Sequence, residues 1–169
     1  MTYTPIVSAL RELASKEKSA LHMPGHKQGQ MPGLLSSWLG TTLHYDQTEV
    51  SGLDDLHAPD GPIRQSERLG AELYGTQATY FTTNGSSAGL IASMLASTDT
   101  GAEVIVPRNA HKAVLAGIIL ADLWPHFVSP VFQDGYQLGI TASGLQAALA
   151  ASPKAQTVIL LNPTYEGVT

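Results

Sequence analysis

Residues 78–90 read ATYFTTNGSSAGL and contain the change of pattern that decides the fold. Residues 78–82 are rich in β-branched and aromatic side chains, which predicts a strand. Gly85 lets the backbone turn tightly after that strand. Residues 86–97 then place their large apolar side chains on one face at helical spacing, which predicts a helix. A strand, a tight turn and a helix form the repeating unit of an α/β protein.

The same alternation continues to the end of the chain. The expected elements are a strand at 103–106, a helix at 111–121, a strand at 124–129, a helix at 144–151 and a strand at 157–161. This order predicts an α/β fold with a mostly parallel sheet flanked by helices. Because residues 158–161 are all apolar, we expect the last strand to be central in a sheet of about four strands.

The first 61 residues have a different character. An amphipathic pattern predicts a helix over residues 5–18. Two stretches rich in turn-forming residues follow, at 22–33 and 48–62, and neither has a helical or strand period. We therefore expect residues 1–61 to form an N-terminal helix and an extended arm.

A second part of the chain begins at Pro62. Proline suits the first turn of a helix and Gly75 suits its C-terminal cap, so a helix is expected between them. Residues 62–169 would then form an α/β domain. The last strand is followed by a polar segment at which the sequence stops, so we expect this domain to be incomplete.

Composition narrows the classes of function. Hydrophobic residues make up 43% of the chain and charged residues 14%, with a net charge of −5 and no cysteine. No cluster of Lys or Arg is present, which argues against a nucleic-acid partner. The longest apolar run, residues 113–121, is too short to cross a membrane, and the N-terminus lacks the pattern of a signal peptide. We expect a cytoplasmic protein.

Two groups of residues could suggest a metal-binding site, but the spacing of neither group favours one. His22 and His26 are separated by a Pro-Gly pair, which argues against the helix that would place both on one face. The acidic residues between 49 and 60 do not have the spacing of a calcium-binding loop. We expect no metal site.

Polar clusters follow three of the expected strands. They read TNGSSAG at 83–89, RNAHK at 108–112 and NPTYEG at 162–167. In parallel sheets, ligands bind where strands end and helices begin, so the three clusters are expected at one edge.

Each cluster has a functional and an ordinary interpretation. Gly85, Ser86 and Ser87 begin a helix, whose free N–H groups suit a phosphate, although a capped helix with small residues would look the same. His111 could stack on a planar ring or move protons, or it could cap its helix. Thr164 could point into the ligand edge or belong to a simple turn.

Five segments occur in an order that resembles one known family. They are HMPGHKQG at 22–29, TEVSGLDDLHAPDGPI at 48–63, TTNGSSAGL at 82–90, VPRNAHKAV at 106–114 and LLNPTYEGV at 160–168. Together they are similar to the major domain of the Orn/Lys/Arg decarboxylases. These enzymes have the aspartate-aminotransferase fold, called fold type I, and use pyridoxal 5′-phosphate.

The resemblance implies roles for particular residues. Ser86 and Ser87, with the turn at Gly85, would hold the cofactor phosphate. His111 would stack on the pyridine ring, with an additional catalytic role in orienting or protonating the reacting carbon, and Thr164 would lie beside the cofactor. The implied reaction is decarboxylation of arginine, lysine or ornithine to the corresponding amine, carried out by a homodimer or larger homo-oligomer.

The resemblance also implies residues that this sequence does not contain. The Schiff-base lysine and the aspartate that pairs with the pyridine nitrogen would lie beyond residue 169. We therefore expect an incomplete piece that is inactive alone. Two alternatives remain: another fold-type-I activity such as an aminotransferase or lyase, or a truncated non-catalytic partner of a full-length enzyme.

Overall fold

The computed structural model describes residues 3–16 and 19–169, which group into two compact units. The first unit extends to Phe81 and the second begins at Thr82. Each unit is described by itself below. The sequence-based division into domains at residues 61 and 62 stays a prediction.

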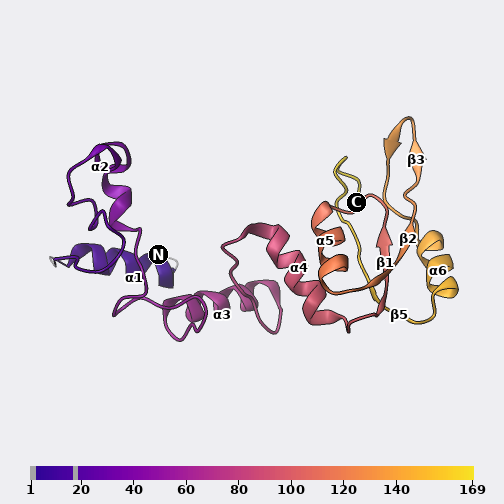
Figure 1. The fold of residues 1–169 in the computed structure, drawn as a ribbon, viewed down its shortest axis with the longest axis horizontal. Helices are drawn as coiled ribbons and strands as arrows, with labels where there is room; N and C mark the ends of the chain where they lie inside the picture. The colour runs from indigo at the N-terminus through magenta and orange to yellow at the C-terminus, as the bar shows by residue number, and fades with distance from the viewer. Residues whose placement is uncertain (1–2, 17–18) are drawn as a thin grey trace. The chain divides into compact units, whose positions relative to one another are not determined.

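The first unit is helical (Figure 1). Its elements are α1 (Pro5–Ser15), α2 (Leu34–Leu39), the 3₁₀ helix η1 (Gly40–His44) and α3 (Pro62–Tyr74). Helix α1 ends at Ser15, earlier than predicted, and residues 17–18 of the predicted helix lie outside the described residues. Helix α2 and η1 were not predicted, because the glycines and prolines around them obscure any period. The prediction of α3 between Pro62 and Gly75 is confirmed.

Helix α3 is capped by a side chain from the loop before it. The N-cap residue Gly61 has no side chain that could accept a hydrogen bond. The side chain of Asp54 caps the helix in its place. Its Oδ2 accepts hydrogen bonds from the backbone N–H groups of Gly61 (2.9 Å), Ile63 (2.9 Å) and Arg64 (3.3 Å). Its Oδ1 accepts from Asp60 N–H at 2.9 Å. One carboxylate thereby orders the acidic loop and satisfies the free N–H groups of the first helical turn.

The second unit is an α/β structure. Its elements are α4 (Gly85–Ser97), β1 (Glu103–Pro107), α5 (Lys112–Leu120), β2 (Trp124–Val128), β3 (Phe132–Gln133), β4 (Tyr136–Gln137), α6 (Ala142–Ala151) and β5 (Ala155–Val158). Strands β2, β1 and β5 form a parallel sheet in that order. Figure 1 shows α4 and α5 on one side of this sheet and α6 on the other. The predicted fold class, a parallel sheet flanked by helices, is confirmed.

The core of this unit is built around β1. Val104, Ile105 and Val106 have no exposed surface. Val104 and Val106 pack in one cluster with residues of α4 and α5, among them Met94 and Ile118. Burying an aliphatic side chain of this size contributes about 1.5–3 kcal/mol each, so β1 is the centre of stability in this unit.

Several predictions about strands are wrong in detail. The expected strand at 78–82 does not form, because no other strand pairs with it within the described residues. The central strand is β1, and β5 lies at an edge of three strands. Strand β5 also ends at Val158, so the apolar residues 159–161 follow it, and Leu160 is 64% exposed. The antiparallel pair β3–β4 was not predicted.

Substitution of Gly117 by alanine tests the contact between α4 and α5. A Cβ atom at Gly117 would lie 2.6 Å from Sδ of the buried Met94, which is closer than packed atoms allow. Overpacking of this kind costs about 1–3 kcal/mol, which exceeds the gain of about 1 kcal/mol from replacing a helical glycine. We expect Gly117→Ala to lower the free energy of unfolding in a denaturant titration.

Gly89→Ala is the matched control. A Cβ there would meet only Thr82 Cγ2 at 3.9 Å, which is an ordinary contact. This variant should be neutral or more stable. Equal stability of the two variants would contradict the close approach of α4 and α5.

The cap by Asp54 predicts a dependence of stability on pH. Burial acts to raise the pKa of Asp54, but hydrogen bonds from backbone N–H groups, chiefly those of Asp60 and Gly61, outweigh it and lower the pKa. A lowered pKa in the folded state means that the stabilisation is fully present above the ordinary aspartate pKa of about 4 and is lost as the pH falls through the folded-state pKa.

We expect Asp54→Asn to lower the free energy of unfolding by about 0.5–2 kcal/mol at neutral pH. The difference between wild type and variant should shrink in denaturant titrations at decreasing pH. A difference that stays constant down to acidic pH would contradict this role.

Candidate functional site

The polar clusters that follow β1 and β5 lie at the same edge of the sheet. Both strands are parallel, so their carboxyl ends point the same way. Residues 108–112 follow the end of β1, and residues 162–167 follow β5 after a short extension. The expected meeting of these two clusters is seen directly: the ring of His111 lies 6.4 Å from the ring of Tyr165, centroid to centroid, at an angle of 34°.

The remaining cluster, residues 83–89, lies at the N-terminus of α4, and the direction of α4 places it toward the same edge. The C-terminal end of α4 lies at the other edge, because only residues 98–102 connect it to the start of β1. The carbonyl of its last residue, Ser97, accepts a hydrogen bond of 3.4 Å from Thr157 Oγ1 in β5. A helix of 13 residues rises about 20 Å, so its N-terminus returns to the carboxyl edge of the sheet. Figure 1 shows this course of the chain.

The N-terminus of α4 carries no cap from its own side chains. Gly85 has φ of +75°, a conformation that suits glycine, and the space beside its Cα is open. Asn84 is the N-cap residue, yet its side chain makes no capping hydrogen bond. Ser86 and Ser87 are exposed. Among residues 3–16 and 19–169, no side chain is seen to cap the N–H groups of this first turn, which could bind an anion with the support of the positive end of the helix dipole.

The other two helices of this unit are capped. His111 is the N-cap of α5, and its Nδ1 accepts a hydrogen bond of 3.1 Å from the backbone N–H of Ala113. Thr141 caps α6, with Oγ1 accepting from Gly144 N–H at 3.0 Å. Both interpretations of His111 therefore remain compatible: it caps its helix, and its ring is half-buried at the ligand edge.

Thr164 shapes the turn that presents Tyr165. It is 5% exposed, its Oγ1 accepts from Val168 N–H at 3.2 Å, and its own N–H donates to the Val168 carbonyl at 2.9 Å. This favours the simple-turn interpretation of its hydroxyl group. Its place beside a cofactor stays a prediction.

Two residues of the edge were not singled out from the sequence. Tyr165 contacts His111, although it belongs to the third cluster and carries an aromatic ring that could have drawn attention. Asn109 lies two residues before His111, and its buried Oδ1 has no hydrogen-bond partner among the residues that the structure describes. A buried acceptor without a donor is uncommon and suggests that a ligand group or water supplies one.

The candidate metal ligands are engaged in other interactions. His26 Nε2 lies 3.0 Å from Asp46 Oδ2, and His22 Nδ1 lies 2.6 Å from the Met23 carbonyl. Asp54 accepts from backbone N–H groups. Within residues 3–16 and 19–169, no group of three or more His, Asp or Glu side chains is arranged to hold a metal ion. No helix in the same ranges combines the length and apolar character needed to cross a membrane.

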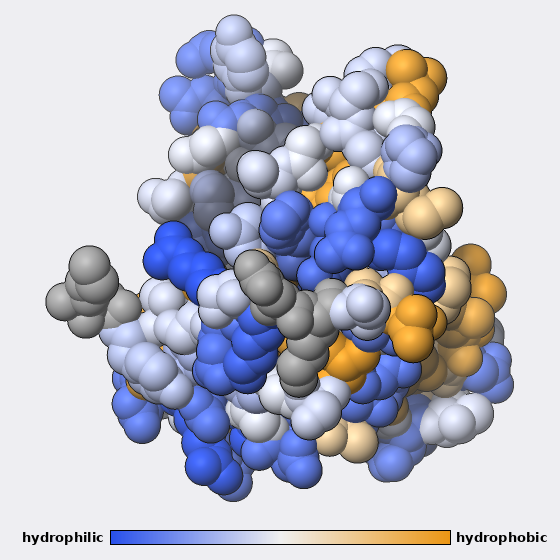
Figure 2. Space-filling model, turned by 90° about the vertical axis from the view of Figure 1, so that its left-hand side faces the viewer, coloured by the Kyte–Doolittle hydropathy of each residue, from blue (hydrophilic) through white to orange (hydrophobic). Residues whose placement is uncertain are grey.

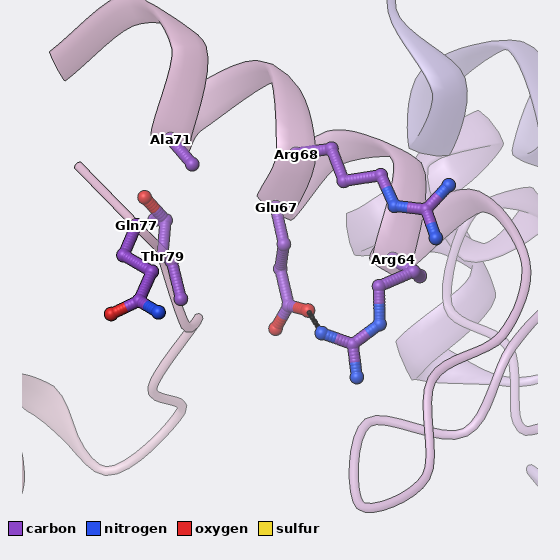
Figure 3. Close-up of a pocket in the computed structure, with 7 residues that line it drawn as sticks. Arg64, Glu67, Arg68, Ala71, Gln77 and Thr79 are labelled. Atoms are coloured by element: carbon purple, nitrogen blue, oxygen red, sulfur yellow. Dashed lines mark hydrogen bonds and ion pairs between the residues drawn. The ribbon is translucent and has the colours of Figure 1, made fainter. Parts of the chain in front are cut away.

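The first unit contains a separate hollow of about 300 Å³ between α3 and residues 77–79 (Figure 3). Glu67 points into it and is 3% exposed. Its Oε2 accepts a hydrogen bond of 2.8 Å from the guanidinium of Arg64, which neutralises the buried carboxylate. None of the predicted cofactor residues lines this hollow.

Comparison with known families identifies the chain. The model of the family described as "Orn/Lys/Arg decarboxylase, major domain" matches residues 4–169. The chain belongs to this family. The five segments that suggested the resemblance lie within the matched range, and three of them form the edge described above.

Individual proteins similar to the chain support its place in the Orn/Lys/Arg decarboxylase family. The chain is 35% identical to an arginine decarboxylase of Bacillus subtilis (strain 168), over 98% of its own length and 34% of the relative. It is 27% identical to the lysine decarboxylase LdcA of Pseudomonas aeruginosa, over 97% of the chain and 25% of the relative. The chain thus spans about a third or less of the curated relatives it matches.

Solved structures show the same fold. The constitutive lysine decarboxylase of E. coli matches with a TM-score of 0.79 at 24% identity, covering 96% of this chain and 25% of that one. The lysine decarboxylase A of Pseudomonas aeruginosa matches with a TM-score of 0.77 at 25% identity, covering 96% and 24%. The arrangement of helices and parallel strands in this chain is therefore also found in these two structures.

Proposed function

We propose that this chain provides the phosphate-binding and ring-binding parts of a pyridoxal-phosphate-dependent decarboxylase acting on a basic amino acid. The observation that carries the proposal is the N-terminus of α4, which has no side-chain cap and belongs to a helix that runs back from β5 toward the edge where His111 lies. Among basic amino acids we favour arginine, because an arginine decarboxylase is the relative of 35% identity.

The residues at this edge fit the cofactor's phosphate. A phosphate needs several N–H or O–H donors and a positive electrostatic environment. The first turn of α4 offers free N–H groups, and Ser86 and Ser87 add exposed hydroxyl groups. The open space at Gly85 lets a ligand approach the backbone closely, whereas a side chain there would both fill that space and be strained at φ of +75°.

The residues also fit the cofactor's ring. His111 offers a planar, half-buried ring that is held by its bond to Ala113 and flanked by Tyr165. Asn109 Oδ1 is a buried acceptor that a bound group could satisfy. When bound, pyridoxal phosphate accepts the electron pair left as the substrate carboxylate departs as CO₂. In this proposal the chain's own residues hold the phosphate, stack on the ring and exclude water from its face.

The whole enzyme would need further parts and a partner. We propose that the cofactor-binding lysine and the aspartate facing the pyridine nitrogen follow this segment, as the family resemblance implies. We also propose a homodimer in the cytoplasm. Exposed apolar side chains support a partner surface, including Leu34 and Trp38 of α2, which are 64% and 74% exposed. Figure 2 shows apolar residues among polar ones on the face it presents.

The proposed phosphate site is tested by comparing the binding of pyridoxal phosphate with the binding of pyridoxal. In a calorimetric titration of the protein carrying this chain, Ser86→Ala/Ser87→Ala should weaken binding of pyridoxal phosphate about tenfold to a hundredfold. Binding of pyridoxal, which lacks the phosphate, should not change between wild type and variant. Ser97→Ala, at the opposite end of α4, is the matched control and should bind both compounds as the wild type does.

The reaction is tested in the holoenzyme. Release of CO₂ from arginine, lysine and ornithine is measured separately, and we expect arginine to be the best substrate. Binding of pyridoxal phosphate without release of CO₂ from any of the three would favour another fold-type-I activity. Failure of the cofactor to bind, together with stable binding to a full-length decarboxylase, would favour a non-catalytic partner.

A further inference from the structure

The hydrogen bond that caps α5 fixes where His111 carries its proton. The backbone N–H of Ala113 can only donate, and it points at Nδ1 of His111 over 3.1 Å. Nδ1 must therefore present a lone pair. A neutral imidazole has one protonated and one unprotonated nitrogen, so the proton lies on Nε2.

The His111 cap stabilises a helix that packs against the core of the second unit. The first turn of α5 contains no acidic residue that could stabilise its N-terminus in another way. Helix α5 also supplies Val114 and Ile118 to the core around β1. Loss of the cap would leave the N–H group of the buried Ala113 without this partner next to that core.

We propose that the α5 cap locks His111 as the Nε2–H tautomer, so that the ring presents a fixed hydrogen-bond donor to the cofactor edge. That this donor faces a cofactor rests on the function proposed above, whereas the tautomer rests on the chain's own geometry. A second proton on the ring would occupy Nδ1 and face the Ala113 N–H, so it would break the cap. In its capped state the neutral His111 ring thus accepts a hydrogen bond at Nδ1 and can donate one from Nε2.

The two nitrogens of His111 have separate tasks, and two amide side chains imitate them one at a time. In asparagine, Oδ1 occupies a position comparable to Nδ1 and can accept from Ala113 N–H, but no group reaches as far as Nε2. In glutamine, the amide N–H₂ reaches as far as Nε2, but the longer side chain is a poor N-cap. His111→Asn therefore keeps the cap and loses the donor, and His111→Gln does the reverse.

The tautomer is measured directly by NMR. The protein is labelled with ¹⁵N at histidine, and long-range ¹H–¹⁵N correlations are recorded without cofactor at neutral pH. The signals of His111 are assigned by their absence in His111→Asn. We expect one nitrogen of protonated type at Nε2 and one of unprotonated type at Nδ1. The opposite tautomer, or a doubly protonated ring, would overturn the proposal.

The variants test the division of tasks. His111→Asn should keep the melting temperature within about 1 °C of wild type, whereas His111→Gln should lower it by about 2–4 °C. Pyridoxal phosphate should bind His111→Asn more weakly than wild type. Thr141→Ala, which removes the cap of α6, is the control: it should lower the melting temperature and leave pyridoxal phosphate binding unchanged.

Two outcomes separate this inference from the proposed function. If His111→Asn melts as low as His111→Gln, the cap is not made by Nδ1 and the inference fails, whatever the cofactor does. If the NMR and melting results are as expected but wild type does not bind pyridoxal phosphate, the tautomer lock stands and the proposed function fails.

Discussion

The burial of β1 between two parallel neighbours is the constraint on which the second unit depends. Val104, Ile105 and Val106 are fully buried, and the hydrogen bonds to β2 and β5 fix the direction of all three strands. Because the strands are parallel, every segment that leaves a carboxyl end emerges at one edge. The meeting of His111 with Tyr165 follows from this direction, although 54 positions (165 − 111) separate them in the sequence.

The helices that begin at this edge differ in how their N-termini are satisfied. Helix α5 uses His111 and α6 uses Thr141, while α4 uses no side chain of its own. Free N–H groups at a helix N-terminus are costly when nothing binds them, and they are useful when an anion does. The uncapped N-terminus of α4 is therefore the place where the proposed function puts the phosphate, and the space beside Gly85 is open.

Elements that depend on a local sequence pattern could be predicted from the sequence. Strands could not be predicted where their formation depends on pairing with another strand. Helices α3 and α5 and strand β1 were predicted within a few residues, since their periods and end signals are local. Residues 78–82 have the composition of a strand, but a strand also requires a partner, which pattern alone cannot supply. The β3–β4 hairpin was missed although Asp134-Gly135, both at positive φ, is a typical two-residue hairpin turn. The places of Ser86 and Ser87 at the start of one helix and of His111 at the start of another could be predicted, and their roles stay predictions. The buried Asn109 Oδ1 emerges only from packing.

The contact between α4 and α5 links the core to the site. A Cβ at Gly117 would lie 2.6 Å from Sδ of Met94, so the two helices approach each other closely at this point. The N-terminus of one helix offers the free N–H groups and that of the other carries His111. Their separation is therefore set by the packing between the helices below them. The cofactor site proposed for this edge would need that separation fixed, and the packing of Gly117 against Met94 would help to fix it.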